Sequence, residues 1–174
     1  MQKSQDDRTL VDPRVFGFGA GLQSPTVETP ADYLSHHTSV LVNVVAKGLA
    51  EALQTFGVTP IEFAVLHWCS GGQAVTVTSL ARISLMDAPR MSRVVTGLVD
   101  RGLLQRQRQR RDRRTVQLVL TEEGQELLPK LGRRVRGFYS VLLEGVSDEE
   151  KRGFAATTRK ILTNSARREA PQVC

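Results

Sequence analysis

Apolar residues recur at helical spacing in the first long segment of the chain that shows a regular pattern. The segment begins with Thr29 and Pro30, which are typical of an N-cap and a first helical residue, and it stops at Gly57. We therefore expect a long helix over residues 30–57, with an apolar stripe wide enough for burial on more than one side. The stripe consists of Leu34, Val40, Leu41, Val44, Val45, Leu49, Ala52 and Phe56.

Two shorter helices are expected next. Thr59, Pro60 and Glu62 match a capping box, and the pair Gly71–Gly72 marks the end of that helix. A second helix is expected over "TVTSLARISLM", with Thr78 as its cap. The residues predicted to face a core are Phe63 and Leu66, with Trp68 or Cys69 as further candidates in the first helix, while the second is centred on Leu80, Ala81 and Ile83.

The segment "APRMSRVVTGLVDRG" predicts an amphipathic helix that Asp87 caps and Gly102 ends. Its apolar residues fall on one face at helical spacing, and several polar residues lie off that face. The apolar face holds Met91, Val94, Val95 and Leu98, and the polar positions are Arg90, Ser92, Arg93 and Thr96.

Two segments then favour β-strands, "LLQRQRQ" from Leu103 and "RTVQLVL" from Arg114. The residues between them form the tip of a hairpin. Arginine is concentrated there, and Asp112 is the one acidic residue in the run. The six arginines are Arg106, Arg108, Arg110, Arg111, Arg113 and Arg114.

The remainder of the chain is expected to be helical. Thr121 can cap a helix that runs to about Glu144, with Pro129 bending it or shortening its first part. Ser147 and Glu150 form a further capping box, for a last helix through about Ser165. We expect a loosely ordered arm over residues 1–29 and a frayed tail over 167–174.

This order predicts a mainly α fold with a small β-hairpin wing, that is, a winged helix-turn-helix. In that fold the helix after Asp87 enters the major groove of DNA with its N-terminal residues near base edges. Arginines at a hairpin tip repel one another until a phosphate backbone passes them, where they release counterions. The sequence therefore favours double-stranded DNA as a partner.

Composition agrees with a nucleic-acid partner. The 174 residues carry a net charge of +6 and a pI of about 9.9, and 40% of them are hydrophobic. No apolar run is long enough for a membrane span and the N-terminus does not resemble a secretory signal, so we expect a cytoplasmic protein of prokaryotic style. Nucleophile–base pairs, phosphate-binding glycine motifs and metal-ligand spacings are not recognisable, so we expect neither enzyme activity, nor a cofactor, nor a metal.

The sequence resembles the MarR family of bacterial transcription regulators over about residues 32–162. The motifs "TPIEFAVLHWCSGG", "LARISLMDAPRMSRVVTGLVDRGLL", "DRR" and "VQLVLTEEG" match the family pattern in order and spacing. The resemblance implies a homodimer with interlocking N- and C-terminal helices, and a palindromic operator. It also implies that Asp112 and Arg114 brace the wing while the other arginines approach DNA.

The predicted DNA-binding residues come from the helix after Asp87 and from the wing. They are Ala88, Pro89, Arg90, Ser92, Arg93, Thr96, Arg108, Arg110, Arg111 and Arg113. Pro89 departs from the family pattern at the start of that helix. The corresponding division of the chain is an arm (1–29), a dimerisation helix (30–57), a DNA-binding lobe (58–121), C-terminal dimerisation helices (122–166) and a tail (167–174).

The family resemblance further implies a pocket for a small aromatic or phenolic effector between the dimerisation helices and the DNA-binding lobe. Candidate lining residues are Tyr33, His36, His37, His67 and Trp68, with core packing or plain surface as the alternative. Cys69 is open to two interpretations, a redox sensor or a buried packing residue. We expect a repressor released from its operator by such an effector. The alternative is an activator or architectural protein that needs no effector.

Overall fold

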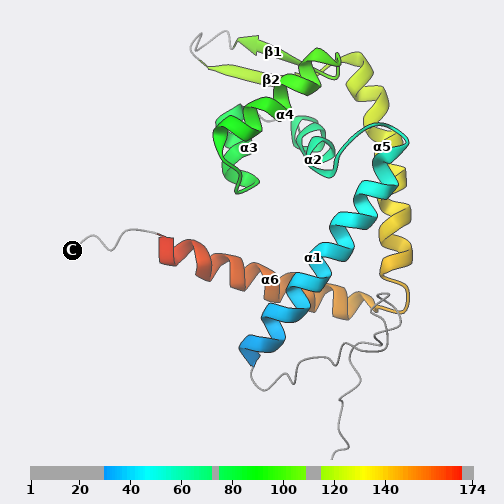
Figure 1. The fold of residues 1–174 in the computed structure, drawn as a ribbon, viewed down its shortest axis with the longest axis vertical. Coiled ribbons are helices and arrows are strands. Elements are labelled where there is room, and N and C mark those ends of the chain that lie inside the picture. The colour runs from blue at the N-terminus through cyan, green and yellow to red at the C-terminus, as the bar shows by residue number, and fades with distance from the viewer. Residues whose placement is uncertain (1–29, 72–74, 109–114, 170–174) are drawn as a thin grey trace, which may run out of the picture. The chain divides into compact units, whose positions relative to one another are not determined.

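The computed structural model describes residues 30–71, 75–108 and 115–169 (Figure 1). The chain divides into two units, Met1–Asn43 and Val44–Cys174. The elements in chain order are α1 (Pro30–Gln54), α2 (Pro60–Cys69), α3 (Val77–Ile83), α4 (Ala88–Asp100), β1 (Leu104–Arg108), β2 (Val116–Leu120), α5 (Glu122–Leu142) and α6 (Asp148–Glu169). The predicted order of helices and strands is confirmed.

Helix α1 begins at Pro30 as predicted, and its last helical residue is Gln54. A turn follows in which Gly57 has a φ of +60°, a backbone conformation that glycine adopts without steric cost. Leu53 in the last turn of α1 is completely buried, although the predicted stripe did not include it. The C-terminal end of α1 is therefore anchored in the core of the second unit.

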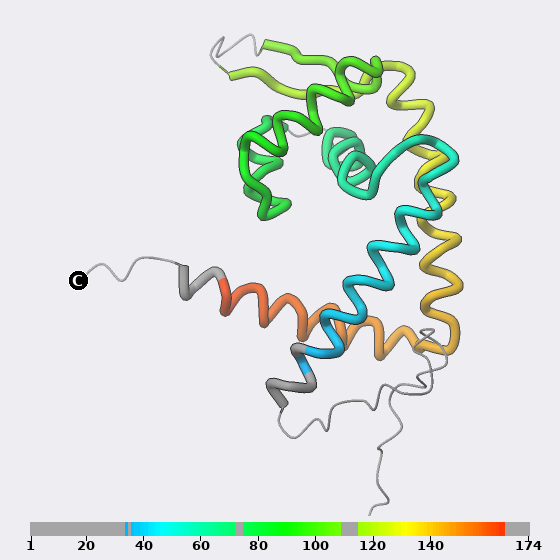
Figure 2. Tube along the Cα trace, in the orientation of Figure 1, coloured from blue at the N-terminus to red at the C-terminus, as the bar shows by residue number. Residues whose placement is uncertain are grey.

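Helices α2 to α5 and the hairpin share one hydrophobic core. Figure 2 traces α4 beside the two strands, and α4 also contacts α2 and α3. The completely buried side chains of this core come from each of these helices and from α1. They are Leu53, Val65, Leu66, Leu80, Met91, Val95, Leu98 and Leu131, with Leu104 and Leu118 almost as deeply buried.

The hairpin is antiparallel, and its register pairs Leu104 with Leu120 and Arg108 with Val116. Val75, which precedes α3, adds a bridge at the other edge of β2, where the backbone N–H of Leu118 donates to the Val75 carbonyl oxygen at 2.8 Å. Val75 is buried, and no pattern in the sequence indicated this pairing. The bridge ties the start of α3 to the middle of β2.

The predicted cap of α3 is wrong by two positions. Thr76 is the N-cap, and it forms a reciprocal pair of hydrogen bonds with Ser79. Thr78 lies inside the helix. A capping box needs a polar side chain three positions after the cap, and Ser79 supplies it for Thr76.

The turn between α3 and α4 contains a residue in a costly conformation. Leu85 has a φ of +52°, which is rare for a residue with a Cβ, and its side chain is 88% exposed. The backbone N–H of Met86 donates to Ala81 at 3.0 Å, which closes this turn. The tight reversal of the helix-turn-helix is therefore maintained at the expense of local strain.

The remaining helix starts are confirmed. Thr121 caps α5, and Ser147 and Glu150 form the capping box before α6. Hydrogen bonds from Ser147 lower the pKa of the Glu150 carboxyl. Helix α5 continues through Pro129, and α6 extends to Glu169, beyond its predicted end at Ser165.

The first turn of α5 lies very close to the start of β1. Gly124 is buried, and a Cβ added there would collide with the carbonyl oxygen of Leu103. The backbone N–H of Thr121 donates to the same carbonyl at 3.3 Å. The absence of a side chain at residue 124 thus allows α5 to pack against the base of the wing.

We expect Gly124→Ala to lower the free energy of unfolding by about 1–3 kcal/mol, because backbone must move to admit the new methyl group. Gly137→Ala is the matched control in the same helix, since a Cβ at residue 137 would meet nothing within 4 Å. That variant should be neutral or more stable by up to about 1 kcal/mol, because alanine favours helix. Urea unfolding measures both, and equal shifts in the two variants would contradict this packing.

Candidate nucleic-acid interface

The orientation of α4 is fixed by its apolar face. Met91, Val95 and Leu98 are completely buried in the shared core. The helix cannot rotate about its axis without exposing these side chains to water. Its opposite face is therefore held toward solvent.

The N-terminal end of α4 begins at a carboxylate cap. Asp87 Oδ1 accepts a hydrogen bond from the backbone N–H of Arg90 at 2.7 Å, and Pro89 lies in the first turn. Both residues stabilise the helix start, because proline lacks the N–H that would otherwise be left without a partner. The side chains that precede the first buried residue of α4 are thus presented on a well-defined helical turn.

The structure places the predicted residues of α4 on or near its solvent face. Ala88, Pro89, Arg90 and Arg93 are exposed, and Ser92 and Thr96 are half-buried. Strand β1, whose residues after Leu104 are exposed, contacts α4. We call the exposed face of α4 and the arginine face of β1 (Arg106 and Arg108) the basic surface.

The alternation of residues in β1 separates arginine from glutamine. Arg106 and Arg108 pair with Leu118 and Val116, so they share the face of the hairpin that carries Leu104 and Leu118 into the core. Gln105 and Gln107 lie on the other face. The arginines of β1 therefore lie on the side of the wing that faces the helices.

One hydrogen bond connects this arginine face to α4. Arg106 Nη2 donates to Thr96 Oγ1 at 3.0 Å. The sequence did not indicate this contact, because a strand residue and a helix residue ten positions apart meet only once the hairpin has packed on α4. It gives Thr96 a partner inside the protein.

The C-terminal end of α4 is held by an ion pair. Arg101 Nη1 lies 3.0 Å from Glu62 Oε1, and the Glu62 side chain is only 14% exposed. Glu62 Oε2 also accepts from the backbone N–H and the hydroxyl of Thr59, each at 2.8 Å. Glu62 thus links the start of α2 to the end of α4.

The hairpin tip lies outside the described residues. The DNA contacts predicted for Arg110, Arg111 and Arg113, and the bracing roles of Asp112 and Arg114, therefore stay predictions. Of the DNA-binding residues predicted in the wing, Arg108 lies within the described residues, and it is exposed at the last position of β1.

The residues predicted for an effector pocket are spread over α1 and α2. His36 and His37 contact each other edge to face with ring centroids 5.4 Å apart, and His67 stacks on Phe63 at 6.1 Å. Trp68 packs partly buried against the core. The side chain of Tyr33 lies outside the described residues, so the pocket stays a prediction.

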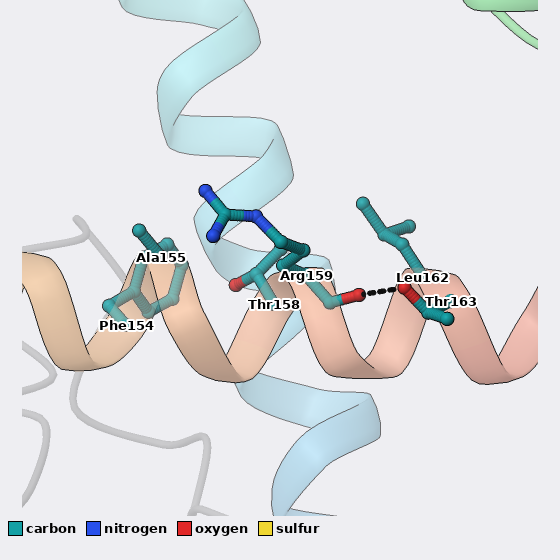
Figure 3. Close-up of a pocket in the computed structure, with 6 residues that line it drawn as sticks. All are labelled: Phe154, Ala155, Thr158, Arg159, Leu162 and Thr163. Atoms are coloured by element: carbon teal, nitrogen blue, oxygen red, sulfur yellow. Dashed lines mark hydrogen bonds between the residues drawn. The ribbon is translucent and has the colours of Figure 1, made fainter.

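Two hollows in the second unit contain none of those predicted pocket residues. One, of about 420 Å³, lies at the corner between α1 and α2 and is lined by Ala50, Glu51, Gln54, Gly57, Val58, Thr59 and Pro60. The other, of about 650 Å³, lies on α6 (Figure 3). Its lining is largely apolar and consists of Phe154, Ala155, Thr158, Arg159, Leu162 and Thr163.

Cys69 has the character of a packing residue. It is 9% exposed, and burial raises the pKa of its thiol from 9.0 to about 11. A thiol with so high a pKa is protonated at neutral pH and is a poor nucleophile.

The described residues also contain no group of three histidine, cysteine or acidic side chains placed to hold a metal ion. Among the described helices, none has the length and apolarity needed to cross a membrane.

Comparison with known proteins identifies this architecture. A model of the MarR family matches residues 56–115. The HTH-type transcriptional regulator YwoH of Bacillus subtilis is 27% identical over 130 residues, which cover 75% of this chain and 94% of that protein.

Solved structures share the fold. An Escherichia coli MarR mutant in complex with operator DNA superposes with a TM-score of 0.68 at 21% identity, over 74% of this chain and 93% of that one. CouR from Rhodococcus jostii RHA1, bound to p-coumaroyl-CoA, gives a TM-score of 0.68 at 24% identity, over 77% and 92% of the two chains.

The fold and the basic surface define a winged helix-turn-helix DNA-binding protein. Residues 56–115, which contain α2 to β1, are thus similar to the MarR family, and the similar full-length protein is a transcriptional regulator.

Proposed function

We propose that this regulator is a repressor that binds a palindromic operator as a homodimer and leaves it when a small aromatic effector binds. The observation that carries the DNA-binding part is the basic surface, in which exposed Arg90 and Arg93 of α4 lie on the same lobe as Arg108 of β1. A helix start carrying Ala88, Pro89 and Arg90 suits the major groove, where arginine binds guanine and apolar groups meet thymine methyl groups.

The wing is proposed to follow the phosphate backbone and the adjacent minor groove. Arg108 continues toward the arginine-rich tip, and each phosphate that an arginine neutralises releases counterions. A narrow minor groove further attracts arginine through its negative potential. Specificity would then come from α4, and much of the affinity from the wing.

Dimerisation is proposed to involve α6 together with the long α1. Phe154 and Leu162 are 62% and 59% exposed, and both line the largely apolar hollow shown in Figure 3. Apolar surface of this kind is costly to leave in water, and the α6 of a second copy offers the same surface for self-complementary packing. A dimer would present two α4 helices to half-sites about 34–36 Å apart.

Release by an effector is proposed from the resemblance to ligand-binding relatives. CouR binds p-coumaroyl-CoA, an aromatic acyl thioester. A ligand of this class would favour a dimer whose α4 spacing no longer fits the operator, provided that it binds that state more tightly. The alternative, an effector-independent activator or architectural protein, would bind DNA through the same surface.

We expect Arg108→Ala to weaken binding to a genomic DNA fragment selected by the purified protein. The slope of log K against log salt should fall by about 0.9 for each phosphate that the variant no longer neutralises. Arg152→Ala is the charge-matched control, because Arg152 is an exposed arginine on α6 outside the basic surface. Fluorescence anisotropy over a salt series measures both variants, and an equal effect of the two would argue against a phosphate contact at Arg108.

We expect Leu162→Glu to convert the dimer into monomers, because two copies would bury an uncompensated carboxylate in their interface. Thr157→Glu introduces the same charge at an exposed α6 position that does not line the hollow, and should stay dimeric. Sedimentation velocity at several protein concentrations distinguishes the two species. A Leu162→Glu variant that remains dimeric would exclude this face of α6 from the interface.

We expect at least one compound in a panel of aromatic acids, phenols and aromatic acyl thioesters to raise the unfolding midpoint and to release operator DNA. At a concentration of 100 times its Kd, a ligand adds about 2.7 kcal/mol of stability. For a chain of this size that corresponds to a rise of roughly 5–11 °C. A panel without any stabilising compound would favour the effector-independent alternative. Metal salts are tested separately in the same assay.

A further inference from the structure

The arginines of β1 share a face of the strand but have different surroundings. Arg106 pairs with the buried Leu118, whereas Arg108 pairs with the exposed Val116, one step nearer the tip. From this inner position the Arg106 guanidinium extends to α4 and donates to Thr96 Oγ1 at 3.0 Å. Arg106 therefore spans the gap between the strand and the helix.

The hairpin needs such a connection beyond its base. Leu104 and Leu118 anchor the hairpin in the core, but on β1 every residue from Gln105 to Arg108 is exposed. A two-stranded ribbon has little stability of its own, and toward the tip, beyond the pair of Arg106 and Leu118, the core no longer supports it. A hydrogen bond from the middle of β1 to α4 restricts bending of the ribbon on the side that faces the helix.

We propose that Arg106 is a positioning residue, which sets the spacing between α4 and the wing through Thr96, and that Thr96 serves as its acceptor and not as a contact to DNA. This inference rests on the proposed function, and it replaces the DNA contact predicted for Thr96 from the sequence. The major and minor grooves of a duplex have a fixed separation, so α4 and the wing bind together only at one spacing. Without the hydrogen bond between Arg106 and Thr96, α4 and the wing would bind DNA together less tightly. Each of them could still approach DNA alone.

A positioning role for Arg106 predicts a distinctive pattern of mutational effects. Arg106→Met and Thr96→Val each remove the bond from one side, so each should lower affinity for the selected operator fragment about fivefold. The double variant should be no weaker than either single variant, because the same single hydrogen bond is missing from all three. Affinity for an unrelated duplex of the same length should change less than twofold.

Two conservative variants and one control complete the experiment. Thr96→Ser keeps the hydroxyl and should bind the operator like the unmodified protein. Arg106→Lys keeps the charge but lacks the planar, branched donor group, and should bind the operator as weakly as Arg106→Met. The salt slope should be unchanged in the variants of Arg106 and Thr96, whereas Arg108→Met should reduce it.

Three results would overturn the inference. These are operator affinity unaffected by Thr96→Val, additive effects in the double variant, or a lower salt slope for Arg106→Met together with normal binding by Arg106→Lys. The last result would show that Arg106 contacts phosphate directly. Failure of the proposed function itself looks different, because the unmodified protein would then bind no duplex in a salt-dependent manner.

Discussion

The burial of one side of α4 is the constraint on which the rest of the structure depends. Met91, Val95 and Leu98 are completely buried, and each contributes about 1.5–3 kcal/mol through its removal from water. Any rotation of α4 that moved Arg90 or Arg93 away from solvent would expose these apolar side chains. The core therefore determines, without any direct contact to the polar face, which residues can meet a ligand.

Polar contacts then fix the ends and the middle of the same helix. Asp87 caps its start, Thr96 receives Arg106 from β1, and Arg101 pairs with Glu62. Glu62 also holds Thr59, just after the turn that ends α1. Contacts of Glu62 therefore join the α1–α2 corner to the C-terminal end of α4.

Local signals made much of this fold predictable from the sequence. Caps at Thr59, Asp87 and Thr121 depend on residues within three positions, and they were located correctly. The α3 cap was misplaced because Thr76 and Thr78 are both plausible hydroxyl caps and only the reciprocal bond with Ser79 separates them. The bridge of Val75 to Leu118 and the bond of Arg106 to Thr96 arise from packing between distant segments, so no local pattern could have indicated them.

The placement of arginine on β1 has a consequence for the protein without DNA. Within the described residues, β2 lies between β1 and Val75, which leaves the outer edge of β1 without a neighbouring strand. Open strand edges invite pairing with the edge of another molecule, and this leads to aggregation. Arg106 and Arg108 would place like charges against each other if two wings approached edge to edge. The charges that suit a polyanion thereby also disfavour edge-to-edge pairing of two wings.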